Sequence, residues 1–380
     1  MWSSSYSAAL RWTSRRRIPT MCDGDSGGLR EGWSACGIHT KISGHDQMRT
    51  NAPESLRRSR GLGRALRTFP SGGRGRRRRR FLKRLRNVDL AKVIRYGQAR
   101  RRKWRELRRT PHPSTVKTPV FIVGCNRSGT NMVCGAIGRS PHGWDYRERD
   151  FSLAFRSYYL RAGWIIEQLI RRTPAPIVSF GSILDSQFTD DLLARFEGAK
   201  ALWVYRNYED VANSCARMAW GHELTNFARW VAHGENERLG ARGERISTET
   251  VQLFRDHYTD ELTLEDAACL YWYMRNQLYF DLNLHEESRV LLVQYEDAVM
   301  NSEKAFRRVF DFLGFPYHPT VIADVSANSV GKHPRPMIDQ AIGEVCGALI
   351  SDLDACFAAS AGVSFGGLSH VATGSGSAYG

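Results

Sequence analysis

One stretch, residues 119–133, constrains the fold of this chain more than any other. It begins with an apolar run, Val120–Val123, which is typical of a short buried strand. A loop with Gly124 and Gly129 follows, and glycines allow a backbone to close around a bound group without a Cβ atom in the way. We expect a helix to begin near Thr130, because a strand that enters a helix through such a loop is a common unit of α/β proteins.

This kind of turn points several backbone N–H groups at one place, and the helix dipole adds positive charge there, so it suits a phosphate or a similar oxyanion. The spacing Gly124-x-x-x-x-Gly129 matches the first part of a P-loop, but Thr130 and Asn131 replace the Lys-Ser/Thr that should follow. A nucleoside triphosphatase needs that lysine on its phosphates, so we do not expect an ordinary NTPase loop. The cation lies inside the loop instead, at Arg127. A glycine-rich turn without a ligand is the alternative.

Strands and helices alternate after residue 119. Further strands are predicted at Pro176–Phe180, Ala199–Tyr205 and Arg289–Tyr295. Helices are predicted at 130–139, 187–196, 208–219, 267–284 and 302–313, with a polar helical insertion at 221–265. This alternation indicates an α/β fold of three layers with a central, mostly parallel sheet. Ligands of such sheets bind beyond the carboxyl ends of the strands, which is where Arg127 and Arg206 fall.

A second polar pair follows the strand predicted at Ala199–Tyr205. Arg206 ends this strand, and Ser214 lies about two turns into the next predicted helix. A guanidinium and a hydroxyl that converge from a strand end and a helix can hold a second phosphate through charge-assisted hydrogen bonds. Taken alone, Arg206 is better explained as a helix-capping or ion-pair residue, and Ser214 as a residue of the helix surface. Together with the loop, they indicate a ligand with two phosphate groups.

Three blocks in this order resemble the sulfotransferases that use 3′-phosphoadenosine 5′-phosphosulfate (PAPS), of the bacterial and carbohydrate type. The first block, Arg127-Ser128-Gly129-Thr130, is similar to the R-S-G-T of the family's 5′-phosphosulfate loop. The second, Tyr205–Ser214, resembles the family's 3′-phosphate element. The third, Val290–Asp297 through Phe312–Pro316, resembles its strand–YED–helix–FLG segment. The resemblance covers roughly residues 119–350.

The resemblance implies a P-loop-like fold, PAPS as the donor and no metal ion. It assigns the 5′-phosphosulfate site to Asn126, Arg127, Ser128, Gly129, Thr130 and Asn131. It assigns the 3′-phosphate site to Arg206 and Ser214. Lys332 lies where relatives return a basic loop to the nucleotide, so it is a further candidate contact to the 3′-phosphate, and a surface lysine is the alternative.

Sulfuryl transfer needs charge stabilisation on the leaving group and a base for the proton of the acceptor. Arg127 is expected to stabilise the leaving phosphate. Glu148 matches the glutamate that many relatives carry shortly after the loop helix, and it is our candidate catalytic base. Asp145 and His142 are competing candidates, and a surface ion pair is the alternative explanation for Glu148.

Two positions depart from the family's pattern. Many relatives carry a basic residue in the segment that is Ile177–Ser186 here, and this segment contains no lysine or arginine. The strand predicted at Ala199–Tyr205 is usually followed by Arg-Asp-Pro in relatives. This chain has Arg206-Asn207-Tyr208 there, so the turn lacks its proline but keeps its arginine. Neither departure removes the expected nucleotide site.

Positive charge is concentrated in the N-terminal part of the chain. Residues 1–118 hold 31 of the 55 Lys and Arg residues and 7 of the 39 acidic residues, so residues 119–380 hold 24 and 32. The high net charge therefore does not indicate a catalytic domain that binds nucleic acid. We predict a disordered Ser/Gly/Arg-rich tail at 1–75, for which Met48 is one alternative start, a basic amphipathic helix and linker at 76–118, the sulfotransferase domain at 119–360 and a flexible Gly/Ser-rich tail at 361–380.

Composition also bounds the environment of the protein. The basic helix suits weak contact with an anionic surface, and RNA or plain solvent are its other possible surroundings. Eight scattered cysteines without a C-x-x-C pair favour reduced thiols over a disulfide framework or a zinc site. No run approaches the ~18–20 apolar residues of a membrane span, and the N-terminus lacks the pattern of a signal peptide, so a cytoplasmic protein is expected.

The sequence thus predicts an enzyme that moves a sulfuryl group from PAPS to a hydroxyl or amine of a small-molecule, glycan or lipid-like acceptor. The acceptor pocket is expected between residues 144–165 and 215–280, which are rich in Trp and Tyr. Two alternatives stay open. The first is a P-loop kinase or NTPase, which the absent lysine argues against. The second is a non-enzymatic nucleotide- or RNA-binding protein that uses the basic arm, although no obligate nucleic-acid partner is expected.

Overall fold

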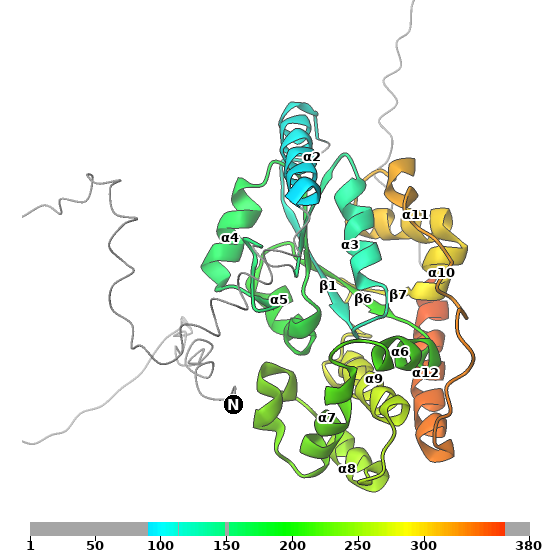
Figure 1. The fold of residues 1–380 in the computed structure, drawn as a ribbon. Coiled ribbons are helices and arrows are strands. Elements are labelled where there is room, and N and C mark those ends of the chain that lie inside the picture. Colours follow the sequence, from blue (N-terminus) through cyan, green and yellow to red (C-terminus); the bar gives the residue numbers. More distant parts are fainter. Residues whose placement is uncertain (1–89, 113, 149–151, 362–380) are drawn as a thin grey trace, which may run out of the picture. The chain divides into compact units, whose positions relative to one another are not determined.

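A computed structural model describes residues 90–112, 114–148 and 152–361 of the chain. The central strands are β1 (Thr118–Gly124), β2 (Gly143–Arg147), β5 (Ile177–Gly181), β6 (Lys200–Tyr205) and β7 (Val290–Gln294). They form one sheet in the order β2–β5–β1–β6–β7, with β1 at its centre (Figure 1). Every neighbouring pair in this sheet is parallel, which confirms the predicted α/β fold with a parallel sheet.

The two faces of the sheet carry separate hydrophobic clusters. Along β1, Phe121 and Val123 belong to one cluster, whereas Val120 and Ile122 belong to the other. All four side chains are fully buried. Successive side chains of a strand point to opposite faces, so such burial requires a cover on both sides of the sheet.

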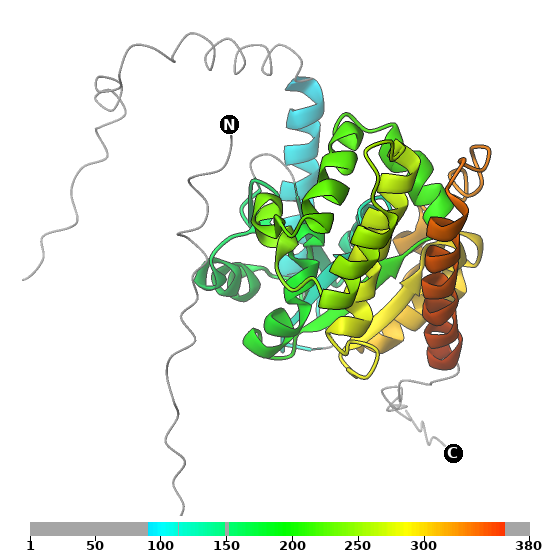
Figure 2. The same cartoon turned by 90° about the horizontal axis from the view of Figure 1, so that it is seen from below.

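Helices supply this cover on both faces, which gives the predicted three layers (Figures 1 and 2). The Phe121 face is covered by α4 (Gly163–Arg172), α5 (Thr189–Arg195), α6 (Tyr208–Ala216), α7 (Leu224–Ala232), α8 (Thr248–His257), α9 (Leu264–Asp281) and α12 (Gln340–Ala361). The Val120 face is covered by α3 (Thr130–Arg139), α10 (Tyr295–Met300) and α11 (Ser302–Leu313). The connections contain a hairpin of β3 (Phe155–Arg156) and β4 (Tyr159–Leu160), and the 3₁₀ turns η1 (Ile183–Phe188), η2 (Gly221–Glu223), η3 (Asn236–Gly243) and η4 (Pro319–Ile322).

Several elements of the structure were not predicted from the sequence, among them β2, the β3–β4 hairpin, α4 and α12. Strand β2 lies in the region that was interpreted as a mixed aromatic segment; it has only five residues, and the charged Asp145 is buried among them. Helix α12, red in Figure 2, packs beside α9. Several helix boundaries also differ, and the helix predicted at 267–284 is α9, Leu264–Asp281. The helix predicted at 187–196 begins with the 3₁₀ turn η1 before α5, and the one predicted at 208–219 ends at Ala216.

The predicted basic helix is present as α2 (Leu90–Arg109), and its part from Gln98 onward belongs to the same compact unit as the sheet. Leu107 is buried in the cluster of the Phe121 face. The Arg100 guanidinium lies 3.5 Å from the ring centroid of Trp144 and donates a hydrogen bond to Asp145 Oδ1 at 2.6 Å. The second half of this helix is therefore anchored to β2.

Several predictions concern residues that the structure does not describe. The tail at 1–75, the first part of the basic helix at 76–89 and residues 362–380 lie outside the described residues. The domain boundaries therefore stay a prediction. Within the described ranges, no helix is both long and apolar enough to cross a membrane.

Candidate active site

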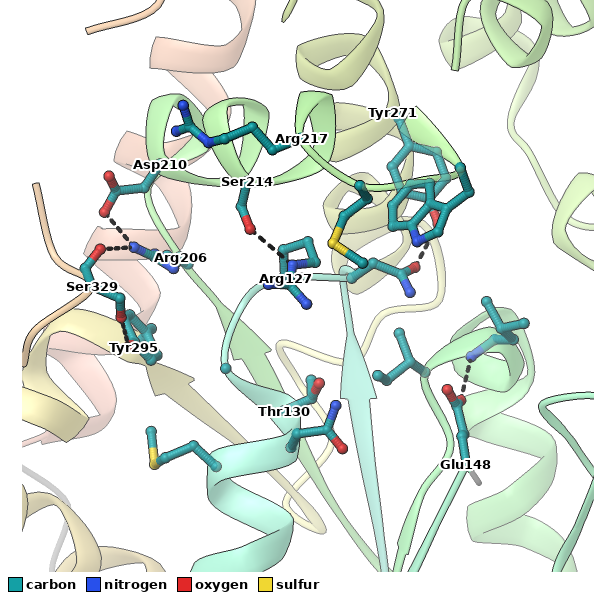
Figure 3. Close-up of a pocket in the computed structure, with 18 of the residues that line it drawn as sticks. Arg127, Thr130, Glu148, Arg206, Asp210, Ser214, Arg217, Tyr271, Tyr295 and Ser329 are labelled. Carbon is teal, nitrogen blue, oxygen red and sulfur yellow. Dashed lines mark hydrogen bonds and ion pairs between the residues drawn. The ribbon is translucent and has the colours of Figure 1, made fainter. Parts of the chain in front are cut away.

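A cavity of about 900 Å³ lies beyond the carboxyl ends of the sheet strands (Figure 3). Each strand is followed by a residue that lines this cavity: Arg127 after β1, Glu148 after β2, Leu184 after β5, Arg206 after β6 and Tyr295 directly after β7. Open parallel sheets bind their ligands at this edge. The cavity is therefore the candidate site.

The cavity brings together nearly all site residues that were predicted from the sequence. Its lining includes Asn126, Arg127, Gly129, Thr130, Asn131, Glu148, Arg206, Ser214 and Lys332. Ser128 is the exception, because it is fully buried beneath the surface of the loop.

Both loop glycines are required by the backbone and by their neighbours. Gly124 has a φ of 121° and Gly129 a φ of 92°, a region that side chains disfavour. A Cβ atom on Gly124 would lie 2.3 Å from the carbonyl oxygen of Val204, and one on Gly129 would lie 2.2 Å from Cδ2 of Tyr295. The loop thus packs closely against β6 and α10, and this contact fixes its curvature.

The loop presents hydrogen-bond donors that lack partners. Gly129 is the N-cap residue of α3, and no side chain caps this helix. The first N–H groups of a helix have no partner within it, so they remain available for an anion. The hydroxyl oxygen of Ser128 is buried and has no hydrogen-bond partner among the described residues. The cradle therefore suits a phosphate or a sulfate group.

Arg127 connects the loop to α6. Its Nε atom donates a hydrogen bond to the hydroxyl oxygen of Ser214 at 2.8 Å (Figure 3). Arg127 is exposed and has a φ of 69°, so the backbone turns its side chain outward, away from the sheet. The two predicted phosphate-binding elements are therefore adjacent.

Arg206 is held firmly at the end of β6. Its guanidinium is 4.5 Å from the centroid of the Tyr295 ring, and NH2 donates to Oδ2 of Asp210 at 2.6 Å and to the carbonyl of Ser329 (Figure 3). The ion pair that the sequence left open as an alternative is thus present. The Nε atom is nevertheless buried without a hydrogen-bond partner among the described residues, although Glu296 Oε1 lies 4.0 Å away.

The loop that carries Lys332 is bound to α6. The N–H of Gly331 donates to Asp210 Oδ2 at 3.3 Å, and the side-chain amide of Asn213 donates to the carbonyl of Pro334 at 2.9 Å. The hydroxyls of Tyr295 and Ser329 also share a hydrogen bond. These contacts keep the exposed Lys332 at the cavity that Arg206 lines.

The departure at Asn207 preserves the turn before α6. Oδ1 of Asn207 accepts hydrogen bonds from the N–H groups of Glu209 at 2.9 Å and Asp210 at 3.4 Å, so Asn207 is the N-cap residue of α6. Its own N–H donates to Glu296 Oε1 at 3.1 Å. An asparagine N-cap stabilises a helix start well, which explains why proline is dispensable here.

Glu148 lies at the side of the cavity opposite Arg206 (Figure 3). Its Oε1 accepts a hydrogen bond from the N–H of Leu184 at 3.2 Å. Burial raises the pKa of this carboxyl to about 8, and the nearby Asp185 adds to the shift, whereas the hydrogen bond from Leu184 opposes it. Burial also raises the pKa of Asp185 to about 7. Glu148 is thus a partly buried carboxyl that titrates close to neutral pH.

Neither competing candidate for the base lines the cavity. Asp145 is buried in β2 and pairs with Arg100 and Arg147, each at 2.6 Å. Burial acts to raise its pKa, but the two arginines outweigh burial and lower it. His142 precedes β2, at the opposite end of the sheet, with its Nδ1 atom 3.2 Å from Nδ1 of His112. Neither alternative therefore lies at the candidate site.

The cavity also contains side chains that were not singled out in the sequence. They are Met132, Tyr158, Ile183, Leu184, Asp210, Arg217, Met218, Trp220, Arg242, Tyr271, Ser329 and His333, besides Tyr295. Several come from 144–165 and 215–280, the segments expected to form an acceptor pocket. Tyr271 donates to Asn126 Oδ1 at 2.7 Å and thus connects α9 to the loop. No local pattern marks these residues, because long-range packing brings them to the cavity.

The charge of the cavity favours an anionic ligand. Five Lys and Arg side chains line it, namely Arg127, Arg206, Arg217, Arg242 and Lys332, against the two acidic side chains Glu148 and Asp210. Cations that converge in a cleft raise the local concentration of anions. Among the described residues, no three His, Cys, Asp or Glu side chains are grouped so that they could hold a metal ion.

Comparison with known proteins gives a consistent match. The model of a family described as a sulfotransferase domain matches residues 117–335. Among solved structures, the sulfotransferase domain from the curacin biosynthetic pathway is 15% identical, with 63% of this chain and 99% of that chain covered and a TM-score of 0.39. A sulfotransferase from Alicyclobacillus acidocaldarius is 17% identical, with 64% and 96% covered and a TM-score of 0.36. No curated protein matches the sequence.

Proposed function

The chain belongs to the sulfotransferase domain family, and we propose that it transfers a sulfuryl group from PAPS to a hydroxyl or amine of a small-molecule, glycan or lipid-like acceptor. One observation carries this proposal. A single cavity has the uncapped start of α3, Arg127 and Arg206 on one side and Glu148 on the other (Figure 3). It thus combines donors for two phosphate groups with a carboxyl that can take a proton.

The residues present fit a donor with two separate phosphate groups. The loop from Asn126 to Asn131 offers backbone N–H groups at the uncapped start of α3 to the 5′-phosphosulfate. Arg206, Ser214 and Lys332 are the proposed contacts of the 3′-phosphate. Arg206 keeps an unpartnered Nε atom for this purpose, and a guanidinium binds phosphate through paired hydrogen bonds.

Bound PAPS supplies a sulfuryl group that is activated by its 5′-phosphate. The acceptor oxygen forms a new bond to sulfur while the bond from sulfur to the bridging phosphate oxygen breaks, and the electron pair of that bond leaves with adenosine 3′,5′-bisphosphate. Arg127 and the N–H groups at the start of α3 stabilise the negative charge on this leaving group. Most of the remaining rate acceleration comes from holding both reactants in one orientation.

Glu148 is the proposed base that removes the proton of the acceptor. A general base works best when its pKa lies near the operating pH, and burial raises the pKa of Glu148 to about 8. The N–H of Leu184 holds the carboxylate in a fixed orientation. The other oxygen, Oε2, is then the atom proposed to receive the proton.

A transfer assay tests the proposal. The full chain is incubated with PAPS labelled with sulfur-35 and a panel of phenols and alcohols, without added metal, and label in the acceptor is measured. We expect transfer in the wild type and a loss of about tenfold or more at low donor concentration in Arg206→Ala, because charge-assisted hydrogen bonds to a phosphate are removed.

Arg289→Ala is the matched control for this experiment. Arg289 is also an ion-paired arginine next to a sheet strand, with its NH2 group 2.7 Å from Glu287 Oε2, but it precedes β7 and so lies at the opposite edge of the sheet. It should leave transfer unchanged. Transfer of the γ-phosphate of ATP instead of a sulfuryl group would refute the proposal.

A further inference from the structure

Arg242 differs from the other cations of the cavity in its position. Arg127 belongs to the loop before α3, and Lys332 belongs to the loop bound to α6. Arg206 directly follows β6, and Arg217 directly follows α6. Arg242 instead lies on η3, which packs against η1, and η1 carries the Leu184 N–H that holds Glu148. Arg242 therefore comes from the part of the fold that surrounds the proposed base, away from the proposed 3′-phosphate contacts.

The side chain of Arg242 is held in place without an acidic partner. Its guanidinium lies 4.3 Å from the centroid of the Phe227 ring. Phe227 in turn meets Tyr271 edge to face, with centroids 5.7 Å apart. The Nε atom of Arg242 is buried and has no hydrogen-bond partner, and no ion pair to Arg242 occurs within the described ranges. The arginine is thus positioned by aromatic stacking and by a hydrogen bond with the Tyr159 side chain, without an acidic partner among the described residues.

A nearby arginine of the same segment does have acidic partners. Arg245, three residues further on, pairs with both Asp190 and Asp191. Arg242 instead lies near the phenol groups of Tyr159 and Tyr271. Burial raises the pKa values of both tyrosines, and the positive charge of Arg242 partly opposes this rise. A cation that is partly removed from water without a carboxylate is costly unless an anion arrives.

The cavity that Arg242 lines also has apolar and aromatic walls. They include Tyr158, Ile183, Met218, Trp220 and Tyr271. Tyr158 has a φ of 72° at the tip of the β3–β4 hairpin, a strained conformation for a bulky residue, and its side chain is 56% exposed. Backbone strain of this kind is found where a side chain is needed at a site. Such a surface suits an aromatic or apolar body.

We propose that Arg242 binds a carboxylate of the acceptor, so that the acceptor is a hydroxylated carboxylic acid with an aromatic or apolar body. This inference rests on the proposed sulfotransferase function, because it assigns the remaining charge of the same cavity to the second substrate. Arg242 lines the cavity, and a guanidinium binds a planar carboxylate through two parallel hydrogen bonds.

The test is a binding measurement on the full chain saturated with adenosine 3′,5′-bisphosphate. Calorimetry compares 4-hydroxybenzoate, 4-hydroxyphenylacetate and 3-(4-hydroxyphenyl)propionate with their methyl esters. These three acids differ in the separation of hydroxyl and carboxylate, so a mismatch of length does not hide binding. We expect at least one acid to bind about tenfold or more tightly than its ester, since hydrogen bonds to charged groups contribute this much.

Variants then assign the preference to one side chain. Arg242→Met should remove the preference for the acid, whereas Arg238→Met should keep it, because Arg238 lies on the same η3 but is 56% exposed and pairs with Glu235. The affinity for the bisphosphate should stay unchanged in both variants, which shows that the fold and the donor site are intact.

Failure of this inference is distinct from failure of the proposed function. If the wild type binds no bisphosphate, the sulfotransferase proposal itself is wrong. If the bisphosphate binds but acids and esters have equal affinity, or none of them binds, the assignment of Arg242 is wrong. Retention of the acid preference in Arg242→Met would overturn it as well.

Discussion

The pH dependence of the reaction separates the candidate bases most clearly. Burial raises the pKa of Glu148 to about 8, so at pH 7 only about one tenth of this carboxyl is ionised, and at pH 9 about nine tenths is. If Glu148 removes the proton, kcat/KM for the acceptor should rise about tenfold or more between pH 7 and pH 9. A bound anionic donor raises the pKa further, so it can only enlarge this rise.

The other candidates predict a different profile. Arg100 and Arg147 lower the pKa of Asp145 despite its burial, and burial lowers the pKa of His142 from its ordinary value, so both groups are already mostly deprotonated at pH 7. A rate that depends on either of them would be constant between pH 7 and pH 9. Asp185, with its pKa raised to about 7, titrates together with Glu148, so the lower part of the profile belongs to the pair.

The assay is the initial rate of sulfuryl transfer at saturating donor over pH 6–10, for the wild type and for Glu148→Gln. The variant should lose the rise above pH 7 and about 10²- to 10⁴-fold in rate at pH 9, which is the usual contribution of a general base. Its affinity for adenosine 3′,5′-bisphosphate should stay unchanged. A constant wild-type rate from pH 7 to pH 9, or a rise that persists in Glu148→Gln, would refute the assignment.

The raised pKa of Glu148 also makes the free energy of unfolding depend on pH. The folded protein holds the proton of Glu148 more tightly than the unfolded chain does. The contribution of this group to the free energy of unfolding is therefore fully present below the ordinary pKa of a glutamate and is lost as the pH rises through about 8. Glu148→Gln should reduce this loss, which urea unfolding at pH 6 and pH 9 can measure.

Two further predictions concern the loop and the arginine pair. Gly129→Ala should destabilise the protein by about 2–5 kcal/mol in urea unfolding, because a Cβ atom is strained at its φ of 92° and meets the Tyr295 ring. The control is Gly314→Ala, which has a similar φ of 81° but no atom within 4 Å of the added Cβ, and it should cost only about 1–2 kcal/mol. Equal losses in the two variants would show that the contact with Tyr295 is not tight. Asp210→Asn should tighten binding of the bisphosphate about fivefold in calorimetry, since the carboxylate competes with phosphate for Arg206; weaker binding would contradict this account.

The sequence predicted four of the five sheet strands and the candidate phosphate-binding elements because these are local features. The strand, loop and helix around Gly129 form one continuous segment, and the separation of Arg206 and Ser214 follows from strand and helix geometry alone. The carboxyl ends of parallel strands meet at one edge, so the convergence of Arg127 with Arg206 was also predictable.

The remaining features depend on contacts between distant residues. Strand β2 is short and its charged Asp145 is buried, which is tolerated because Arg147 and, from α2, Arg100 pair with it. The environment of Glu148 depends on Leu184, which follows another strand. Arg242 became notable only when the structure showed an arginine at the cavity without an acidic partner among the described residues.

The most direct test of the central claim is the choice of nucleotide by the full chain. Calorimetry would compare adenosine 3′,5′-bisphosphate, adenosine 5′-phosphate and ATP with Mg²⁺. The account predicts tight binding of the bisphosphate alone, because the loop at α3 and Arg206 with Lys332 provide two separate phosphate sites. Equal or tighter binding of ATP with Mg²⁺ would contradict it and would favour a kinase-like enzyme instead.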